Sequence, residues 1–162
     1  MDIFEFAIQM ERDGQQYYHE LASKTTHTGM KDILNVLAAD ELGHQHVIEQ
    51  IRAGSDIVAE TEVLAKAKNV FQQMKDFGGK IDLSGDEESL YRRAIELEQR
   101  SVSFYLDRAD QVETPEQKAL FRKLAEEEKK HWYLLDCLLN FLASPETWLE
   151  DAEFGRLDEY CP

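Results

Sequence analysis

The sequence is poor in the residues that break helices or crosslink small domains. Only three of its 162 residues are proline, and its two cysteines, Cys137 and Cys161, form no CxxC pair and fit no zinc-ligand spacing. No uninterrupted apolar stretch reaches about 18 residues, and the N-terminus lacks a basic segment followed by an apolar run. These absences argue against a membrane-spanning or secreted protein, and we expect a soluble, cytoplasmic one.

Positive charge is scarce as well. The chain has 18 lysine and arginine residues against 33 aspartate and glutamate residues, which gives a formal net charge of −15. A field of this sign repels nucleic acid and anionic membrane surfaces, and it concentrates cations. We therefore expect neither nucleic acid nor a membrane among the partners. A chain of this length is expected to form one domain with a core of its own.

Apolar residues recur with the 3.6-residue period of an α-helix along most of the chain, which predicts an all-α fold. Four long helices are expected at residues 3–24, 29–53, 85–110 and 115–142. Thr28 is a candidate N-cap of the second helix, and Gly54 is expected to end it. Capping boxes are expected at the start of the third helix, from Ser84, and of the fourth, from Thr114.

The remaining segments are less regular. Residues 55–83 are expected to form a long crossover, in which residues 59–77 could be helical. A short fifth helix is expected to begin at Ser144. We therefore divide the chain into a four-helix bundle at residues 1–143 and a short C-terminal helix and tail at residues 144–162.

The two halves of the chain are similar to each other at a single offset. Residues 7–18 align with residues 94–105 at an offset of 87 (94 − 7 = 87). Residues 37–44, LAADELGH, align with residues 124–131, LAEEEKKH, at the same offset. One gapless repeat therefore covers both helices of each half. This pattern predicts a duplicated helical hairpin, and two such hairpins would form a four-helix bundle.

Each copy of the repeat places a glutamate three residues before a histidine. The pairs are Glu41 with His44 and Glu128 with His131. Three residues are about one helical turn, so both side chains of a pair leave the helix on one face. A carboxylate and an imidazole on one face, supplied twice, indicate a metal site.

The repeat adds one glutamate from the other helix of each copy, Glu11 and Glu98. Each lies in the middle of a seam of apolar or small residues that has the spacing of a core face. Glu11 and Glu41 are equally far from residue 26, the centre of their turn, and Glu98 and Glu128 are equally far from residue 113. In an antiparallel hairpin both members of a pair then lie at one level, about 22 Å from the turn.

Four glutamates and two histidines are therefore predicted to converge in one layer of the core. Glutamates on acidic helices usually face water, but these have apolar neighbours on the same seam above and below. Four buried carboxylates without a cation would cost many kcal/mol through desolvation and mutual repulsion. Two divalent cations would balance them and leave the histidines neutral as ligands. A Glu from each of two helices with Glu-x-x-His from each of the other two is the pattern of carboxylate-bridged di-iron and di-manganese bundles. The predicted ligands are Glu11, Glu41, His44, Glu98, Glu128 and His131.

Two tyrosines and two small residues lie near this predicted site. Tyr18 and Tyr105 each follow a candidate ligand by seven residues, which places them on the same helix face two turns on. Their hydroxyls either hydrogen-bond the carboxylates and steady them, or belong to core tyrosines in contact with water. Gly14 and Ser101 lie one turn after a candidate ligand, and their small size would leave space for a bound small molecule.

Over residues 3–142 the chain resembles the rubrerythrin-type branch of the ferritin-like superfamily. The resemblance rests on Glu11…Tyr18, Asp40-Glu41-x-x-His44, Glu98…Tyr105 and Glu127-Glu128-x-x-His131. It implies a ferritin-like bundle that holds two iron ions. In such proteins the Glu of each ExxH bridges the two ions, and the other ligands are terminal. Carried over, Glu41 and Glu128 would bridge, whereas Glu11, Glu98, His44 and His131 would be terminal.

Two features differ from the rubrerythrins that reduce peroxide. Those proteins usually carry an additional Glu one turn after the third-helix ligand, where this chain has Ser101. They also often carry a rubredoxin domain with paired CxxC motifs, which is lacking in this sequence. The resemblance therefore implies a stand-alone protein that receives electrons from a separate donor protein.

The function implied by the resemblance is that of a non-haem di-iron oxidoreductase of the peroxidase or ferroxidase type, acting in oxidative stress. Its small-molecule substrate would be hydrogen peroxide or O₂. The alternative is a non-catalytic iron-binding, iron-handling or sensor module. The ligands also suit manganese or a mixed Mn/Fe pair. We expect the protein to be a homodimer.

Overall fold

The computed structural model describes residues 2–54 and 85–143, together with residues 63, 65–67, 69–70 and 73 of the segment between them. The regular structure of the described residues is helical throughout, as the periodicity predicts. Its four long helices are α1 (Ile3–Lys24), α2 (Thr28–Arg52), α4 (Gly85–Ala109) and α5 (Pro115–Ala143). Each bound lies within one residue of the sequence-based expectation. None of these helices is both long enough and apolar enough to cross a membrane.

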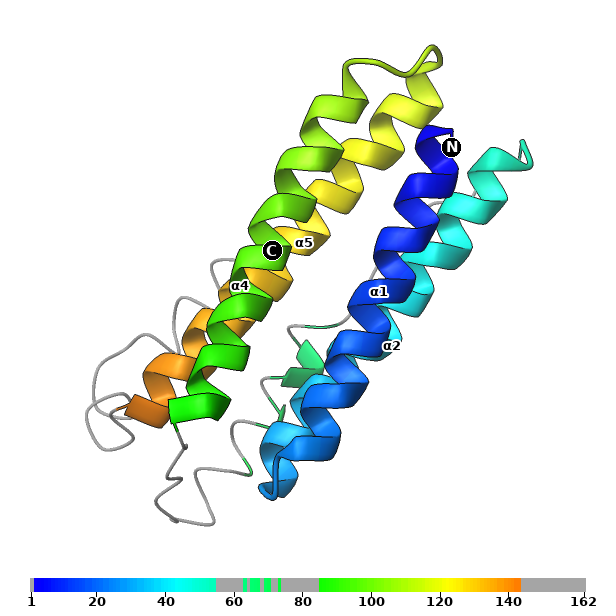
Figure 1. Ribbon diagram of the computed structural model, residues 1–162. Helices are drawn as coiled ribbons and strands as arrows, with labels where there is room; N and C mark the ends of the chain where they lie inside the picture. The colour runs from blue at the N-terminus through cyan, green and yellow to red at the C-terminus, as the bar shows by residue number, and fades with distance from the viewer. Residues whose placement is uncertain are drawn as a thin grey trace.

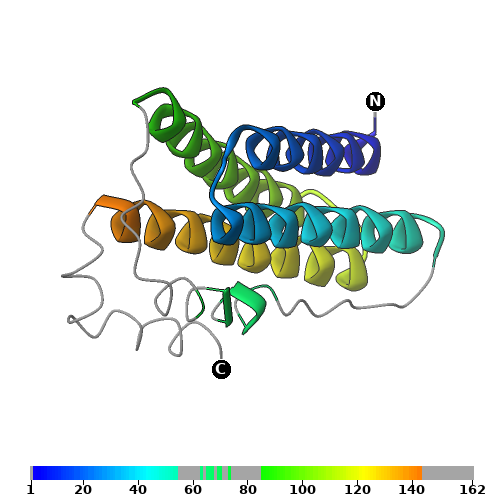
Figure 2. The same ribbon diagram turned by 90° about the horizontal axis from the view of Figure 1, so that it is seen from below.

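The four helices form two antiparallel hairpins that lie side by side, α1 with α2 and α4 with α5 (Figure 1). Figure 2 shows α1 and α4 in one layer and α2 and α5 in the other. The end of α2 and the start of α4 lie at opposite ends of the bundle (Figure 1). The predicted bundle of two hairpins is therefore confirmed. Most of the predicted crossover and the predicted short helix from Ser144 lie outside the described residues.

The helix ends follow local capping chemistry, with one exception to the expectation. At the start of α5, Thr114 Oγ1 accepts the backbone N–H of Gln117 at 3.2 Å, as a capping box requires. Gly54 follows the end of α2 with φ 84°, a conformation that glycine adopts without steric cost. The expected N-cap Thr28 is wrong, because α2 already includes this residue. The N-cap position belongs to His27 instead. The predicted box from Ser84 lies outside the described residues.

The apolar core is split into two clusters along the bundle. One contains mainly aliphatic residues with Tyr18 and Tyr91 and extends to the end at which α1 joins α2. The other contains Phe121 and Tyr105 and lies toward the opposite end. The candidate metal ligands belong to neither cluster, and their positions in the four helices place them between the two. The charged layer is therefore enclosed by apolar packing on both sides, which keeps it away from solvent.

Candidate metal centre

All six candidate ligands are buried in the middle of the bundle. The exposed fraction of each residue is 4% or less, although four of the six are glutamates. Helices α1 and α4 contribute one glutamate each, and α2 and α5 contribute one glutamate and one histidine each. The structure thus brings together every residue of the predicted set. The repeat and the height-matched seams were sufficient to predict that these six residues converge.

The six side chains form two overlapping groups of four. In each group, one possible ligand atom per residue lies within 4.8 Å of those of the other three. Both groups contain Glu41 and Glu128. The first group adds Glu11 and His44, and the second adds Glu98 and His131. Because Glu41 and Glu128 belong to both groups, their carboxylates are placed to bridge a pair of cations.

Both imidazole rings present the same nitrogen to this layer. His44 Nδ1 lies 2.9 Å from Glu128 Oε1 and 3.3 Å from Glu11 Oε2. His131 Nδ1 lies 3.3 Å from Glu41 Oε1. The two rings stack with their centroids 5.3 Å apart. Because Nδ1 faces the carboxylates in both copies, the Nε2 atoms face away from the layer.

The two tyrosine hydroxyls hydrogen-bond the terminal carboxylates in a reciprocal pattern. Tyr18 donates to Glu98 Oε1, and Tyr105 donates to Glu11 Oε1. Each tyrosine therefore bonds the glutamate of the other hairpin and not the one on its own helix. Of the two alternatives left open by the sequence, the structure supports hydroxyls that steady carboxylates. These two bonds also tie the hairpins together at the level of the site.

Asp40 is a residue at the site to which the sequence alone assigned no role. Its Oδ2 atom lies 2.7 Å from His131 Nε2 and 3.7 Å from His44 Nε2. A carboxylate that accepts the Nε2 proton of His131 leaves Nδ1 free to bind a metal and fixes the orientation of the ring. A signal was present in the sequence, because an acidic residue precedes the Glu of both ExxH copies.

The second copy of this acid has different surroundings. Glu127 occupies the position equivalent to Asp40 at the offset of 87. Its carboxylate is buried and pairs with Lys130 Nζ at 3.0 Å and Lys123 Nζ at 3.3 Å. The surroundings of the two histidines are therefore unequal, although their ligand groups are copies.

Comparison with known proteins agrees with this geometry. The sequence model of the Rubrerythrin family matches residues 2–139. The chain belongs to the rubrerythrin family. Among solved structures, a hypothetical protein from Pyrococcus furiosus is 21% identical, with a TM-score of 0.63 and 90% of each chain covered. At this identity the similarity shows a shared fold alone. A comparison with curated proteins gives no match.

The charges of this rubrerythrin-family site are balanced by protons when no cation is present. Burial, with repulsion from Glu41, raises the pKa of Glu11 to about 8. Burial and the neighbouring carboxylates also raise the pKa of Glu128. Burial alone would lower the pKa of His44, but its hydrogen bonds to Glu11 and Glu128 raise it well above its usual value. Near neutral pH, the metal-free layer therefore holds protons that a pair of divalent cations would displace.

Unpartnered polar atoms give a second test of whether the site suits a metal pair. Glu98 Oε2 and His131 Nδ1 are buried and make no hydrogen bond in the structure. Buried polar groups without partners are costly, and such atoms call for an ion or another ligand. Four carboxylates and two neutral imidazoles would balance two divalent cations. The donor set therefore fits the pair of ions that the rubrerythrin resemblance implies.

The two small residues leave open space where the sequence predicts it. Gly14 and Ser101 both line a cavity of about 530 Å³ that reaches the glutamates of the site. A Cβ atom at Gly14 would come within 3.3 Å of Glu41 Oε1, so glycine allows α1 to pass close to a shared carboxylate. Access to the layer is thus through the side formed by α1 and α4.

Proposed function

We propose that this member of the rubrerythrin family binds two iron ions in the six-residue layer and is a non-haem di-iron oxidoreductase. The observation that carries the proposal is the pair of buried four-residue groups that share Glu41 and Glu128. In this proposal both shared carboxylates would hold both ions. Glu11 and His44 would hold one ion, and Glu98 and His131 would hold the other.

The proposed reaction is the reduction of hydrogen peroxide or O₂. A pair of iron ions held by these residues would supply the two electrons that, with two protons, reduce one peroxide molecule to two water molecules. A separate electron-donor protein then restores both electrons. Manganese or a mixed pair would fit the same donor atoms. We propose that this takes place in the cytoplasm, in a homodimer.

The residues around the layer hold the ligands in position for this reaction. Burial and the charge of Glu11 raise the pKa of Tyr105 well above its usual value, so its hydroxyl stays protonated and keeps donating to that carboxylate. Asp40 keeps the proton of His131 on Nε2, which directs the Nδ1 lone pair into the layer. The apolar clusters shield the carboxylates from solvent toward both ends of the bundle.

An iron-handling module without turnover is the second candidate. The observation that favours it is Ser101, which lines the cavity at the position where peroxide-reducing rubrerythrins usually carry an additional Glu. Storage in the manner of ferritin requires a closed shell of many subunits. A solution mass of a monomer or a dimer would therefore exclude storage but not iron transfer.

Metal analysis of anaerobically purified protein tests the site itself. About two metal ions per chain are expected, and Glu41→Ala combined with Glu128→Ala should abolish this stoichiometric binding. The matched control is Asp32→Ala with Glu126→Ala, which removes two exposed acids from the same two helices. If the native protein holds no metal and both double variants behave like it, the site assignment is wrong.

Stopped-flow absorption after loading with Fe²⁺ tests the reaction. The reduced protein is expected to be oxidised by peroxide or O₂ faster than free Fe²⁺ at the same concentration. Oxidation no faster than that of free Fe²⁺, in a protein shown to hold two iron ions, would reject the oxidoreductase and favour the iron-handling module.

A further inference from the structure

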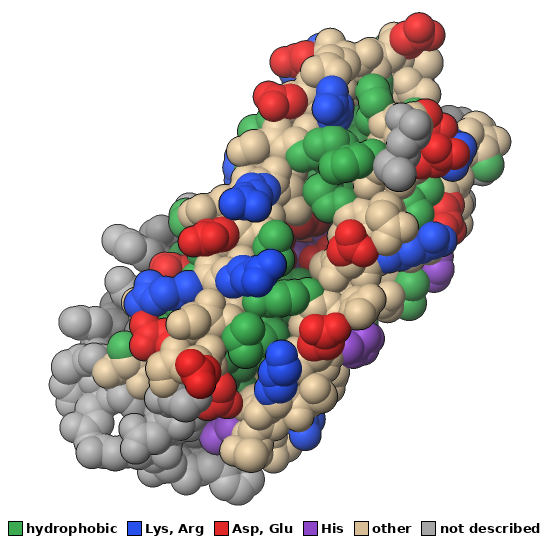
Figure 3. All heavy atoms as spheres, viewed as in Figure 1, with side chains coloured by type: hydrophobic (Ala, Val, Ile, Leu, Met, Phe, Trp, Pro, Cys, Tyr) green, Lys and Arg blue, Asp and Glu red, His purple; other side chains and the backbone are tan. Residues whose placement is uncertain are grey.

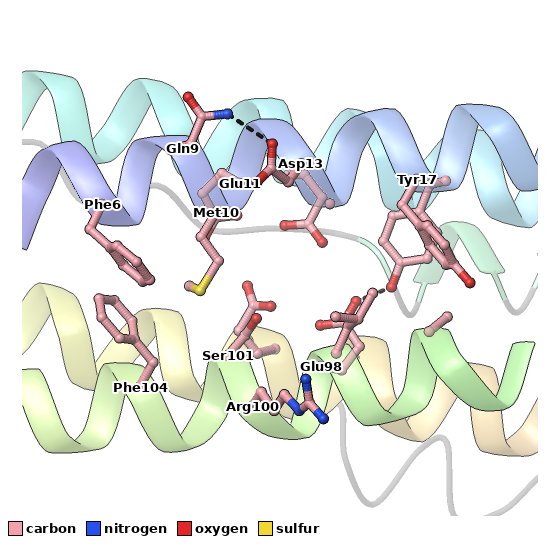
Figure 4. A pocket seen from close by; sticks show the side chains of 16 residues that line it. Phe6, Gln9, Met10, Glu11, Asp13, Tyr17, Glu98, Arg100, Ser101 and Phe104 are labelled. Atoms are coloured by element: carbon pink, nitrogen blue, oxygen red, sulfur yellow. Dashed lines mark hydrogen bonds between the residues drawn. The ribbon is translucent and has the colours of Figure 1, made fainter. Parts of the chain in front are cut away.

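The cavity between α1 and α4 has defined ends and a defined floor (Figure 4). At one end the rings of Phe6 and Phe104 meet, with their centroids 4.9 Å apart. At the other end Tyr17 donates its hydroxyl hydrogen to the backbone oxygen of Leu90 at 2.9 Å. The four glutamates of the metal layer form the floor. This is an elongated pocket with two defined ends that is open to solvent along its outer side.

The size of the cavity exceeds what peroxide or O₂ requires. Its volume is about 530 Å³, whereas one water molecule occupies about 30 Å³ of the liquid. Cavities of about 300–1,000 Å³ are typical of sites for organic ligands. Phe6 and Tyr17 are eleven residues apart on one helix, so the ends of the cavity are separated by about 16 Å. An organic molecule with an extended chain fits these dimensions.

The walls of the cavity are mainly apolar. Met10 from α1 and Ala94 and Leu97 from α4 line it between the two ends. Phe6 and Leu97 remain 48% and 36% exposed, although both are large hydrophobic residues. Figure 3 shows hydrophobic side chains gathered along the boundary between the two hairpins on this face. Such a surface favours an alkyl or aromatic body over a polar ligand.

One cation lines the cavity without a protein partner. Arg100 forms no ion pair or hydrogen bond with any residue that the structure describes. Across the cavity, Asp13 Oδ1 accepts a hydrogen bond from Gln9 Nε2 at 2.8 Å (Figure 4). A guanidinium group binds a carboxylate through two parallel hydrogen bonds. The guanidinium of Arg100 therefore favours an anionic head group at its own position in the cavity.

We propose that this cavity binds a monocarboxylate with an extended apolar chain. The chain lies between Met10 and Leu97 over the carboxylate layer, and the head group pairs with Arg100. The proposal goes beyond the proposed metal centre, because it concerns the walls of the cavity and not the candidate ligands in its floor. It adds an organic ligand to a site whose proposed substrates are peroxide and O₂.

Calorimetric titration of the purified protein with decanoate tests the proposal, with hexanoate and 1-decanol as comparison ligands. Decanoate should bind with one molecule per chain and more tightly than hexanoate. Ser101→Phe places a ring in the cavity and should weaken decanoate binding by about tenfold or more. Arg100→Gln should weaken decanoate about two- to fivefold, as for an exposed ion pair, and leave 1-decanol unchanged.

Two variants on the same helix serve as matched controls. Ser103 is exposed and its hydroxyl bonds the backbone oxygen of Gln99, so Ser103→Phe adds the same ring outside the cavity. Arg92 pairs with Glu88, so Arg92→Gln removes the same charge at a distance from it. Both controls should bind decanoate as the native protein does.

The proposal is overturned by absence of saturable decanoate binding up to about 1 mM, or by equal binding to the native protein and Ser101→Phe. The native protein could instead be a dimer that does not bind decanoate, with the Ser101→Phe variant a monomer. This result would overturn the proposal and show that a second copy of the chain covers the cavity. Metal content is measured on every sample. If the native protein binds decanoate but holds no metal, this proposal stands and the di-iron centre is rejected. If the native protein holds metal but does not bind decanoate, the di-iron centre stands and this proposal is rejected.

Discussion

Raising the pH is expected to destabilise the metal-free protein. The pKa of Glu11 rises from 4.5 to about 8 on folding, through burial and repulsion from Glu41. The folded state then binds this proton more tightly than the unfolded chain, so the stabilisation is complete below pH 4.5 and is lost as the pH rises through about 8. The raised pKa values of His44 and His131 act in the same direction above pH 6.5.

The size of the effect follows from the proton on Glu11. Between about pH 6 and pH 8 the folded protein retains a proton that the unfolded chain has released, which costs about 1.4 kcal/mol per pH unit. Over these two pH units the free energy of unfolding falls by about 2.3 kcal/mol, because about half of this proton has already left the folded protein at pH 8. For a chain of this length, the melting temperature should fall by roughly 5–10 °C. The two histidines should increase the fall further.

Circular-dichroism melts of chelator-treated protein from about pH 6 to pH 8 measure this fall in melting temperature directly. Protein reloaded with Fe²⁺ under anaerobic conditions should keep or raise its melting temperature, because metal binding has already displaced the protons. Glu11→Gln resembles the protonated carboxyl, so its metal-free melting temperature should depend less on pH. A metal-free native protein whose melting temperature stays level or rises over this range would refute the reasoning.

Three substitutions test the surroundings of the ligands. Asp40→Asn should weaken binding of one of the two metal ions about 10- to 100-fold, because His131 loses its carboxylate acceptor; a metal titration resolves the two steps. Tyr105→Phe should cost about 1–3 kcal/mol in the metal-free protein by leaving a buried carboxylate without its donor, measured by urea unfolding. Gly14→Ala should displace the Glu41 carboxylate, which lies 3.3 Å from the added Cβ, and change the absorption spectrum of the loaded protein.

Each of these substitutions has a control in the same fold. Asp32→Asn alters an exposed acid of α2 and should leave both metal-binding steps unchanged. Tyr17→Phe removes a hydroxyl that bonds the backbone of Leu90 and should not affect the stability of the carboxylate layer. Gly43→Ala meets no atom within 4 Å, so it should stabilise α2 by about 0.5–1 kcal/mol without changing the spectrum. If a substitution and its control have equal effects, the proposed cause of that effect is wrong.

The role of Asp40 shows where sequence reasoning reaches its limit. Its partner His131 is 91 positions away, and the contact depends on how far the two hairpins slide along each other. The repeat predicts two equivalent acids, but Glu127 pairs with Lys123 and Lys130. A side chain one methylene longer, beside two lysines, has different partners in the folded protein. The inequality of the two copies could not be predicted from their alignment.

The tyrosine contacts show the same limit in another form. The sequence places Tyr18 on the helix face of Glu11, but seven residues correspond to about 10 Å along the axis, which is beyond the reach of a hydroxyl. The hydroxyl bonds Glu98 on α4 instead. Periodicity identifies the face of a helix, whereas the partner on that face belongs to whichever helix packs against it.

The sequence by itself determined the four helices, the duplicated hairpin and the six residues of the layer. These features depend on local periodicity and on one offset of 87 residues, and both can be read along a single chain. The tertiary structure alone decided three others: the hydrogen bonds exchanged between the hairpins, the contact of Asp40 with His131 and the cavity between α1 and α4. These depend on the distance and relative height of two hairpins, which result from core packing between residues far apart in the sequence.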